Sequence, residues 1–280
     1  MANMYNVLQK ENELWRRWKC GYVPDWNNPK DLNEKICKEI IDNDMDMWTE
    51  LADKVLVRDF VIERGYGDNL SELYGVWDKT SDIDFDSLPD KFVIKCNHDS
   101  GSSKIIDKKK GFDKAQVKRF LDSHLASTFG VGSCEPHYFG IKKKILAEEY
   151  LEDVDSFSNT PVDYKFWCFD GEVASCLVCY DRIGGGHATF DLYDVNTWEP
   201  MRQYLTARNT AKFKDVPKPE NLEFMVKMAS DLSKGFKHVR VDLYNTKRGV
   251  IFGEMTFTSM CGRIFYFTDE YLKILGDKMR

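Results

Sequence analysis

The sequence predicts an α+β fold, because it combines helical segments with antiparallel hairpins. Residues 1–52 place apolar side chains at helical spacing. Two hairpins follow, one at 162–182 that turns at Asp170-Gly171 and one at 238–258. The chain has 280 residues, of which 42% are hydrophobic, so it can form one large domain or two or three subdomains around a cleft.

The N-terminal region is expected to be mainly helical. Residues 11–20 and 32–65 carry apolar side chains at helical spacing, and a polar loop separates them. Asn28, directly before Pro29, is the expected cap of the second helical segment. Gly65 is expected to end that segment.

Short strands follow the helical region. Residues 73–78 predict a strand, and the acidic segment 79–90 predicts a connector. A strand at 92–96 runs into a polar loop of small residues at 97–103, and a return strand is expected at 104–107.

The second half alternates helices with further strands. Residues 113–129 predict an amphipathic helix capped by Asp113, and 142–152 predict a strand with an acidic end. Residues 184–200 predict a glycine-rich loop and another strand pair, and 219–235 predict a helix.

Composition excludes several classes of protein. The net charge of −6 disfavours a nucleic-acid binder, which would be basic. The first twenty residues contain no apolar run typical of a signal peptide, so a cytoplasmic location is expected. No stretch approaches the roughly 18 apolar residues of a membrane span, so no transmembrane segment is expected.

The eight cysteines are scattered, and reduced thiols are favoured over disulfides. Cys176 and Cys179 lie three apart on an expected strand, where their side chains point to opposite faces and make a poor zinc site. A Cys2His2 site from residues 96–98 and 134–137 stays an alternative, although its spacing matches no common template.

The last hairpin carries two carboxylates on one face. If residues 245–249 form the loop, Asp242 pairs with Phe252, and Glu254 is a diagonal neighbour about 7–8 Å away. Two such carboxylates can share a hard cation, with Arg240 across from Glu254 to balance the charge. The alternative is a solvated face with an ordinary Arg–Glu pair.

Two lysines lie in apolar strands. Lys95 and Lys165 have apolar neighbours, and a buried ammonium is costly unless it meets an anion. Together with the backbone N–H groups of the 97–103 loop and the carboxylate pair, they suggest bound phosphates and Mg²⁺. Each lysine alone also fits an edge strand with its amine in water. Residues 146–152 offer an apolar slot and carboxylates for a base and a ribose.

The joint pattern resembles the ATP-grasp superfamily and, within it, the teichuronopeptide-biosynthesis (TupA-like) family. The resemblance covers roughly residues 50–260. It rests on these segments: "ADKVLVRDFV", "GVWD", "IDFDSLPDKFVIKCNHDSGS", "AEEYLED", "DYKFWCFDG", "VRVDLY" and "FGEMTF". It implies an ATP-grasp fold in which two α+β subdomains, 91–151 and 152–280, clamp a nucleotide after a helical region and connector at 1–90.

The resemblance also implies cofactors and site residues, with ATP and Mg²⁺ as the cofactors. Asp242 and Glu254 would bind the metal, and Arg182, Arg240 and Lys165 would be catalytic. The expected nucleotide-binding residues are Lys95, Ser100, Gly101, Ser102, Ser103, Glu148, Glu149, Tyr150, Leu151 and Lys165.

The chain departs from the family pattern after the second metal ligand. Many ATP-grasp enzymes have Asn two residues after the metal-binding Glu, where this sequence has Thr256, so the resemblance leaves the number of Mg²⁺ ions open. Expected substrate contacts are His98, Asp99 and Arg263. His98 and Asp99 fit a purely structural role in the turn equally well.

The activity implied is that of a carboxylate–amine ligase that forms an amide through an acyl phosphate, in the biosynthesis of a surface polysaccharide such as a capsule or a teichuronopeptide-like polymer. The expected partners are a small-molecule acid and an amine or sugar-linked acceptor, without nucleic acid and with the oligomeric state open. The alternatives are an ATP-grasp kinase, a cysteine-based metal-binding module, and a glycosyltransferase that would use the Asp-x-Asp motifs within 82–86.

Overall fold

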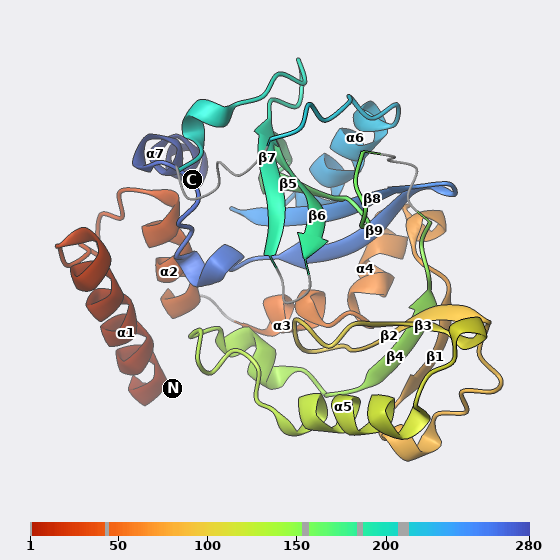
Figure 1. Ribbon diagram of the computed structural model, residues 1–280. Coiled ribbons are helices and arrows are strands. Elements are labelled where there is room, and N and C mark those ends of the chain that lie inside the picture. Colours follow the sequence, from red (N-terminus) through yellow and green to blue (C-terminus); the bar gives the residue numbers. More distant parts are fainter. Residues whose placement is uncertain (1, 43–44, 153–156, 184–186, 207–212) are drawn as a thin grey trace.

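Two antiparallel sheets, each backed by a helix, form the body of the protein (Figure 1). The computed structural model describes every residue except 1, 43–44, 153–156, 184–186 and 207–212. The helices are α1 (Ala2–Cys20), α2 (Leu32–Asp42), α3 (Asp46–Ala52), α4 (Val57–Glu63), α5 (Lys114–Ala126), α6 (Leu222–Ser233) and α7 (Asp269–Lys278). The strands are β1 (Leu73–Trp77), β2 (Lys91–Cys96), β3 (Lys104–Asp107), β4 (Ile145–Glu149), β5 (Asp163–Phe169), β6 (Glu172–Ile183), β7 (His187–Tyr193), β8 (Val239–Thr246) and β9 (Gly249–Thr256).

The first sheet has the strand order β1-β4-β2-β3, and each neighbouring pair is antiparallel. All four strands were predicted from the sequence. Strand β1 lies before residue 90, where the first subdomain was expected to begin, so this sheet takes one of its strands from the N-terminal region.

Helix α5 covers one face of the first sheet and leaves the other face to the cavity described below. Phe92 and Ile94 of β2 are fully buried in a cluster with Leu121 of α5. Because side chains alternate along a strand, Lys95 points to the opposite face. The predicted cap of α5 is confirmed, since the Asp113 carboxylate accepts the N–H of Gln116 at 3.0 Å.

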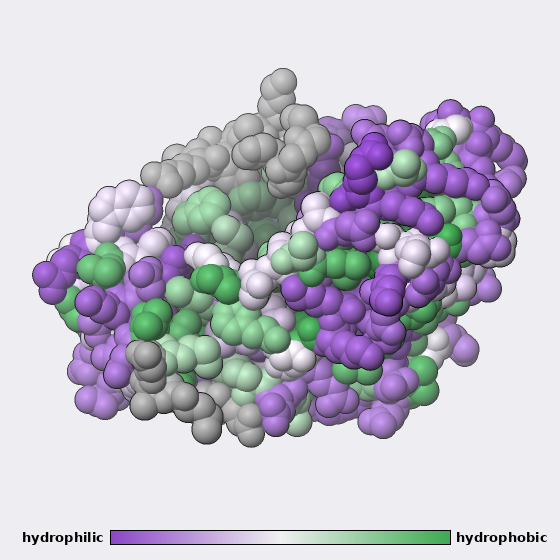
Figure 2. Space-filling model, turned by 90° about the horizontal axis from the view of Figure 1, so that it is seen from below, coloured by the Kyte–Doolittle hydropathy of each residue, from purple (hydrophilic) through white to green (hydrophobic). Residues whose placement is uncertain are grey.

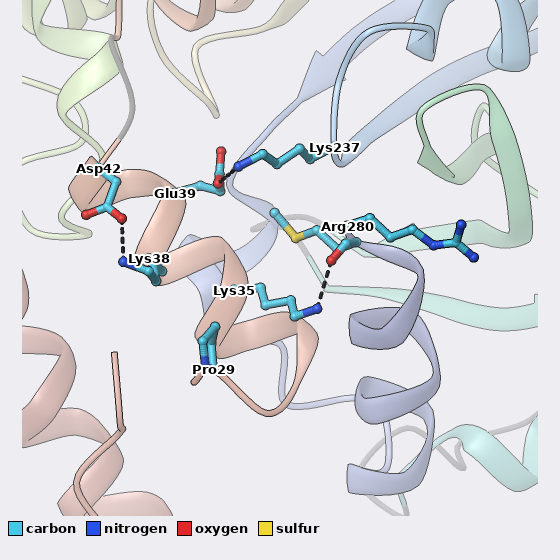
Figure 3. A pocket seen from close by; sticks show the side chains of 8 residues that line it. Pro29, Lys35, Lys38, Glu39, Asp42, Lys237 and Arg280 are labelled. Atoms are coloured by element: carbon cyan, nitrogen blue, oxygen red, sulfur yellow. Dashed lines mark hydrogen bonds and ion pairs between the residues drawn. The ribbon is translucent and has the colours of Figure 1, made fainter. Parts of the chain in front are cut away.

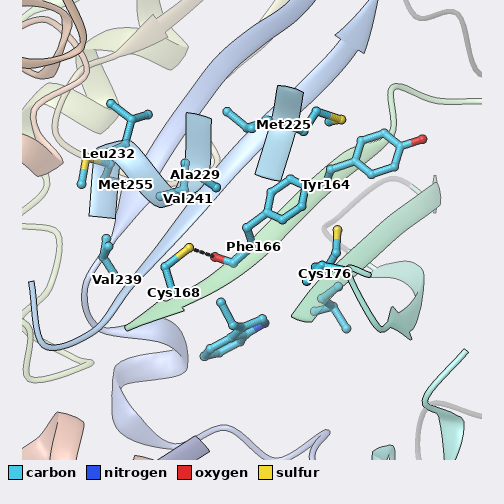
Figure 4. Packing of buried hydrophobic residues seen from close by; sticks show 14 of the residues in the cluster. Tyr164, Phe166, Cys168, Cys176, Met225, Ala229, Leu232, Val239, Val241 and Met255 are labelled. Carbon is cyan, nitrogen blue, oxygen red and sulfur yellow. Dashed lines mark hydrogen bonds between the residues drawn. The ribbon is translucent and has the colours of Figure 1, made fainter. Parts of the chain in front are cut away.

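The second sheet has the order β7-β6-β5-β8-β9 and is also antiparallel throughout. Figure 4 shows helix α6 against one face of this sheet, with Met225 and Leu232 near Phe166 and Val241. All four side chains are fully buried. Burial of such a side chain contributes about 1.5–3 kcal/mol, so this layer fixes the sheet that carries most of the site.

The predicted hairpin turn at 170–171 is confirmed. Asp170 and Gly171 have φ values of 44° and 84°, as a tight turn between twisted antiparallel strands requires. The strand pair expected at 184–200 is only partly correct. Strand β7 forms and pairs with β6, but its expected partner is limited to an isolated bridge between Tyr193 and Pro200. Residues 184–186 of the glycine-rich loop lie outside the described residues.

The helical N-terminal region is confirmed, with a correction to its cap. Residues 32–65 form three short helices, and α2 begins at Leu32. The Asp31 carboxylate accepts the N–H of Glu34 at 2.8 Å, so Asp31, and not Asn28, holds the cap position. The Glu34 carboxylate accepts the N–H of Lys30, the residue before the cap, at 2.7 Å, so the two acidic side chains together hold the start of the helix.

The surface mixes apolar and polar side chains. On the face seen in Figure 2, hydrophobic residues gather across the middle and hydrophilic ones predominate to the right. Exposed apolar side chains are common on folded proteins, so this face alone does not mark a site. Among the helices that the structure describes, none combines the length and the apolar character needed to cross a membrane.

Candidate active site

A cavity of about 430 Å³ lies between the two sheets, and we call it the intersheet cavity. Its volume is typical of small-molecule sites. It is lined by Lys54, Arg58, Leu70, Ser71, Val93, Lys95, Asp99, Ser100, Gly101, Ser103, Ile105, Glu148, Glu149, Tyr150, Leu151, Pro161, Asp163, Lys165, Arg182, Asp242, Tyr244, Phe252, Gly253 and Glu254. Most of the site residues predicted from the sequence therefore lie in one place.

The β8–β9 hairpin brings Asp242 directly opposite Glu254. The predicted register, in which Asp242 pairs with Phe252, is wrong for two reasons. The turn is shorter than expected, because Thr246 already pairs with Gly249. The shorter turn already makes Leu243 pair with Phe252, and a bulge between Asp242 and Leu243 then shifts the ladder by one residue, so that Asp242 pairs with Glu254.

Gly253 lies at this bulge, where no larger residue fits without movement. A Cβ atom there would lie 2.9 Å from the Asp242 backbone oxygen and 3.0 Å from a ring atom of Tyr244. The glycine therefore permits the close approach of the two strands that aligns the carboxylates.

Two cations hold the carboxylate pair in place. Lys165 lies opposite Asp242 on β5, and its ammonium donates to the Asp242 carboxylate. Arg240 donates to both Asp242 oxygens at 2.7 and 2.8 Å and to Glu254 Oε1 at 3.0 Å. Burial acts to raise the pKa of Glu254, but Lys165 and Arg240 outweigh it and lower that pKa to about 2. Glu254 is therefore ionised throughout the physiological pH range.

The two carboxylates fit a Mg²⁺ ion that takes its other ligands from phosphates and water. Mg²⁺ in nucleotide sites is commonly held by one or two carboxylates, with substrate oxygens completing the octahedron. Nowhere in the described chain do three or more His, Cys, Asp or Glu side chains group as metal ligands. Thr256 Oγ1 donates to Glu254 Oε1 at 3.2 Å and accepts from Arg240 at 3.1 Å, so its hydroxyl orients the carboxylate.

Lys95 faces the cavity from the first sheet and pairs with Glu148. Glu148 lies across from Val93, the residue two before Lys95, which makes the pair diagonal. Ser71 Oγ also donates to Glu148, at 3.1 Å. Both charged side chains are largely buried, and removing one partner of such a pair costs about 3–5 kcal/mol.

The 97–103 loop contributes three of its four expected nucleotide contacts to the cavity wall. Ser100, Gly101 and Ser103 line the cavity, and Gly101 has a φ of 92°. Ser102 is buried instead, and its hydroxyl accepts the N–H of Cys96 at 2.9 Å and donates to Asp99. Its side chain is placed to hold the turn.

The remaining nucleotide and phosphoryl residues also line the cavity. Glu149, Tyr150 and Leu151 continue the wall after β4. Arg182 pairs with Asp163 at the opposite wall. The roles expected for these residues stay predictions.

Two of the expected substrate residues lie outside the cavity. Asp99 lines it, but its carboxylate contacts Ser102 and His124. His98 is buried, and neither ring nitrogen has a hydrogen-bond partner in the described part of the chain. The Arg263 guanidinium lies over the Trp15 ring, 5.7 Å from its centroid, at a distance from the cavity.

Sequence reasoning missed three charged residues of the cavity wall. Lys54 precedes α4, Arg58 lies within α4, and Asp163 is the first residue of β5. Lys54 Nζ donates to the Asp99 backbone oxygen at 2.5 Å, and burial lowers the pKa of Lys54. Lys54 and Arg58 lie within "ADKVLVRDFV" and Asp163 within "DYKFWCFDG", so the segments were singled out in the sequence although these three residues were not.

The cysteine and Asp-x-Asp alternatives find no support in the structure. Cys176 and Cys179 are buried free thiols. Asp84 accepts the N–H of Asp86 at 3.0 Å in an exposed turn, and neither residue lines the intersheet cavity.

Another cavity, of about 380 Å³, lies between α2 and the end of α7 (Figure 3). Its three lysines already have partners: Lys237 pairs with Glu39 at 2.6 Å, Lys38 pairs with Asp42 at 2.5 Å, and Lys35 Nζ donates to the Met279 backbone oxygen at 2.8 Å. None of the predicted site residues lines it. The intersheet cavity is therefore the candidate active site.

Comparisons with known proteins give one family match. The sequence profile of the family described as TupA-like ATPgrasp matches residues 34–280. No curated protein matches the chain.

Several solved structures are similar in part. They include D-alanine–D-alanine ligase from Bacillus anthracis complexed with ATP, at 15% identity and a TM-score of 0.47, over 82% of this chain and 65% of that one. D-cycloserine synthetase DcsG matches at 12% identity and a TM-score of 0.46, over 84% and 72% of the two chains. The ATP-grasp ligase PsnB, complexed with a minimal precursor, matches at 12% identity and a TM-score of 0.41, over 81% and 59%. The chain thus spans about 65% of the length of the first of these relatives.

Proposed function

The chain belongs to the TupA-like ATP-grasp family, and on that premise we propose that it is an ATP-dependent carboxylate–amine ligase. Membership confirms the resemblance found in the sequence and, with it, the ATP-grasp fold class. ATP and Mg²⁺ are the cofactors of ATP-grasp enzymes, and one similar solved structure is a complex with Mg and ADP. A role in surface-polysaccharide biosynthesis and a cytoplasmic location belong to the proposal.

One observation carries the proposal. The Asp242–Glu254 pair lies in a cavity whose walls also present Lys95, Lys165 and Arg182. Asp242 and Glu254 would hold Mg²⁺, which neutralises charge on the nucleotide phosphates when bound. Each of these cations has a carboxylate partner and more than one N–H donor, so it can donate to a triphosphate while it keeps that partner.

The apolar part of the wall suits an adenine base. Leu70, Val93, Ile105, Leu151 and Phe252 all line the cavity. They come from both sheets and from the segments next to them, which would place the base between the two subdomains. The Glu149 carboxylate at the same end could accept the ribose hydroxyls.

The proposed reaction has two steps. A carboxylate oxygen of the acid attacks the γ-phosphorus of ATP, ADP leaves, and an acyl phosphate forms. The amine nitrogen then attacks the acyl carbon, inorganic phosphate leaves, and the nitrogen gives up a proton to yield the amide. Lys95, Lys165 and Arg182 would contribute by positioning and by stabilising negative charge, which dominate phosphoryl transfer.

A thermal-shift titration with Mg-ATP, followed by ADP detection over acids and amines, tests this function. We expect Mg-ATP to raise the melting temperature and ADP release to need an acid and an amine together. ADP release with a hydroxyl compound alone would make the protein a kinase. Stabilisation by a nucleotide sugar in place of ATP would indicate a glycosyltransferase.

A further inference from the structure

A side pocket of about 250 Å³ opens next to the carboxylate pair of the intersheet cavity. The two spaces share Lys54, Asp99, Ser100, Gly253 and Glu254. The rest of the side pocket is largely apolar, with Leu51, Val57, Phe129, Tyr138, Met255 and Met260 in its wall. A molecule bound there would lie beside the place proposed for phosphoryl transfer.

Glu135 is the one carboxylate of the side pocket, as far as the structure describes it, that pairs with no Lys, Arg or His side chain. Its residue is 7% exposed, and its carboxylate accepts from the hydroxyls of Thr258 and, at 2.6 Å, Ser133. The Cys261 thiol is a third, weaker donor at 3.4 Å. None of the ion pairs between described residues includes Glu135. Neutral donors offset only part of the cost of removing a carboxylate from water, so the site favours a cation.

The cations that line the side pocket are already committed. Arg240 contacts Asp242 and Glu254, and Lys54 donates to the Asp99 backbone oxygen. Burial, Glu135 and Glu254 together raise the pKa of Tyr138, whose side chain is in the same wall. The electrostatic potential of the pocket is therefore negative near Glu135, because neither of its cations contacts that carboxylate.

The backbone around Glu135 is held in conformations that L-residues seldom adopt. Met260 and Cys261, in the turn that follows β9, have φ values of 49° and 58°. This turn brings Thr258 and Cys261 onto the carboxylate. Gly130 has a φ of 89°, and a Cβ atom there would lie 2.5 Å from the Glu135 backbone oxygen. Such strain costs free energy and is typical of functional sites.

We propose that the side pocket binds the amine substrate, with Glu135 as the counter-charge of its ammonium group and the apolar wall around its carbon skeleton. The ligand class is a primary amine with an apolar body. A ligand that also carried a carboxylate, such as an amino acid, would need a cation of its own, and both cations of the described wall already have partners. The assignment rests on the proposed ligase function and adds to it the chemistry of the acceptor, which the nucleotide-binding residues do not specify.

A matched pair of probes tests this assignment. Ligand-observed NMR titrations would compare 3-methylbutylammonium with 3-methylbutanol, which differ in charge and little in shape. We expect the wild-type protein to bind the ammonium compound about tenfold or more tightly, as a charge-assisted hydrogen bond allows. Glu135→Gln should abolish that preference and leave the Mg-ATP thermal shift unchanged. Glu50→Gln, which removes an exposed carboxylate on α3, should keep both.

Two results would overturn the assignment: equal binding of both probes by the wild-type protein, or an unchanged preference in Glu135→Gln. If that variant does not fold, Met260→Arg replaces it, because Met260 is 44% exposed and the new guanidinium would occupy the pocket beside Glu135. Retained ammonium preference in Met260→Arg would count against the assignment in the same way. If Mg-ATP does not raise the melting temperature of the wild-type protein, the ligase function is wrong. The preference for the ammonium probe would then test only whether the side pocket binds an amine.

Discussion

Asp242 lies directly opposite Glu254 in the β8–β9 ladder, and Arg240 Nη2 contacts both carboxylates at 2.8 and 3.0 Å. Like charges at this spacing repel unless cations or a metal offset them. The structure supplies Arg240 and Lys165 for that purpose. Lys165 and Arg240 therefore balance the charge of the two carboxylates when no metal is bound, and both carboxylates are placed to bind the same metal ion.

Replacing either carboxylate should lower activity far more than stability. We expect Asp242→Asn and Glu254→Gln each to lower ATP turnover at least a hundredfold, because each would remove a ligand of the proposed Mg²⁺. Asp242→Asn should also lower the free energy of unfolding, by about 1–3 kcal/mol, since its side chain is only 2% exposed and bonded to two cations. Glu254→Gln should cost less stability, because its side chain is 45% exposed. Turnover assays and urea unfolding would measure both effects, and full turnover in either variant would refute the metal assignment.

The lysines should contribute to nucleotide affinity from opposite walls. We expect Lys95→Met and Lys165→Met each to weaken Mg-ATP binding about tenfold or more in calorimetric titrations, because each removes a charged donor to phosphate. Lys79→Met is the matched control, since Lys79 is an exposed lysine outside the cavity. Wild-type affinity in both cavity variants would mean that the phosphates bind elsewhere.

Gly253 should be needed for the alignment of the carboxylates. A Cβ atom there would press against the Asp242 backbone and the Tyr244 ring, so we expect Gly253→Ala to lower stability by about 1–3 kcal/mol and turnover more than tenfold. Gly132→Ala places its Cβ in open space on an exposed loop and should change neither. A fully active Gly253→Ala variant would show that the bulge does not set the site.

Acid should destabilise the fold through His238. Burial lowers the pKa of His238 to about 4, against about 6.5 in an unfolded chain. Between about pH 6.5 and 4, the His238 imidazole therefore binds a proton in the unfolded state but stays neutral in the folded state. The contribution of His238 to the free energy of unfolding should be fully present above pH 6.5. It should decrease by a few kcal/mol as the pH falls toward 4. In His238→Gln, urea unfolding between pH 7 and 4 should show a shallower decline, and an identical decline would exclude His238 as a cause.

The sequence predicted the strands and the residues of the site better than the register between them. The apolar neighbours of Lys95 and Lys165 were enough to single out both lysines, and both line the cavity. The Asp242–Glu254 register depended on a two-residue turn and a bulge, and a single glycine in a strand specifies neither.

Lys54 and Glu135 were missed for a different reason. Their neighbours are distant in sequence: Lys54 contacts the 97–103 loop, and Glu135 contacts the turn after β9. Local periodicity marks such residues only as parts of a helix or a loop. Their position in the cavities follows from the tertiary packing of α3, α4 and the segment after α5.

The stoichiometry of the reaction tests the central claim most directly. ADP and the remaining free amine would be measured in the same reaction, with Mg-ATP, an acid and an amine identified by the screen. The ligase function predicts one amine consumed for each ADP formed, and neither change in Glu254→Gln. ADP formed while the amine stays constant, with a phosphorylated hydroxyl compound as the product, would contradict it.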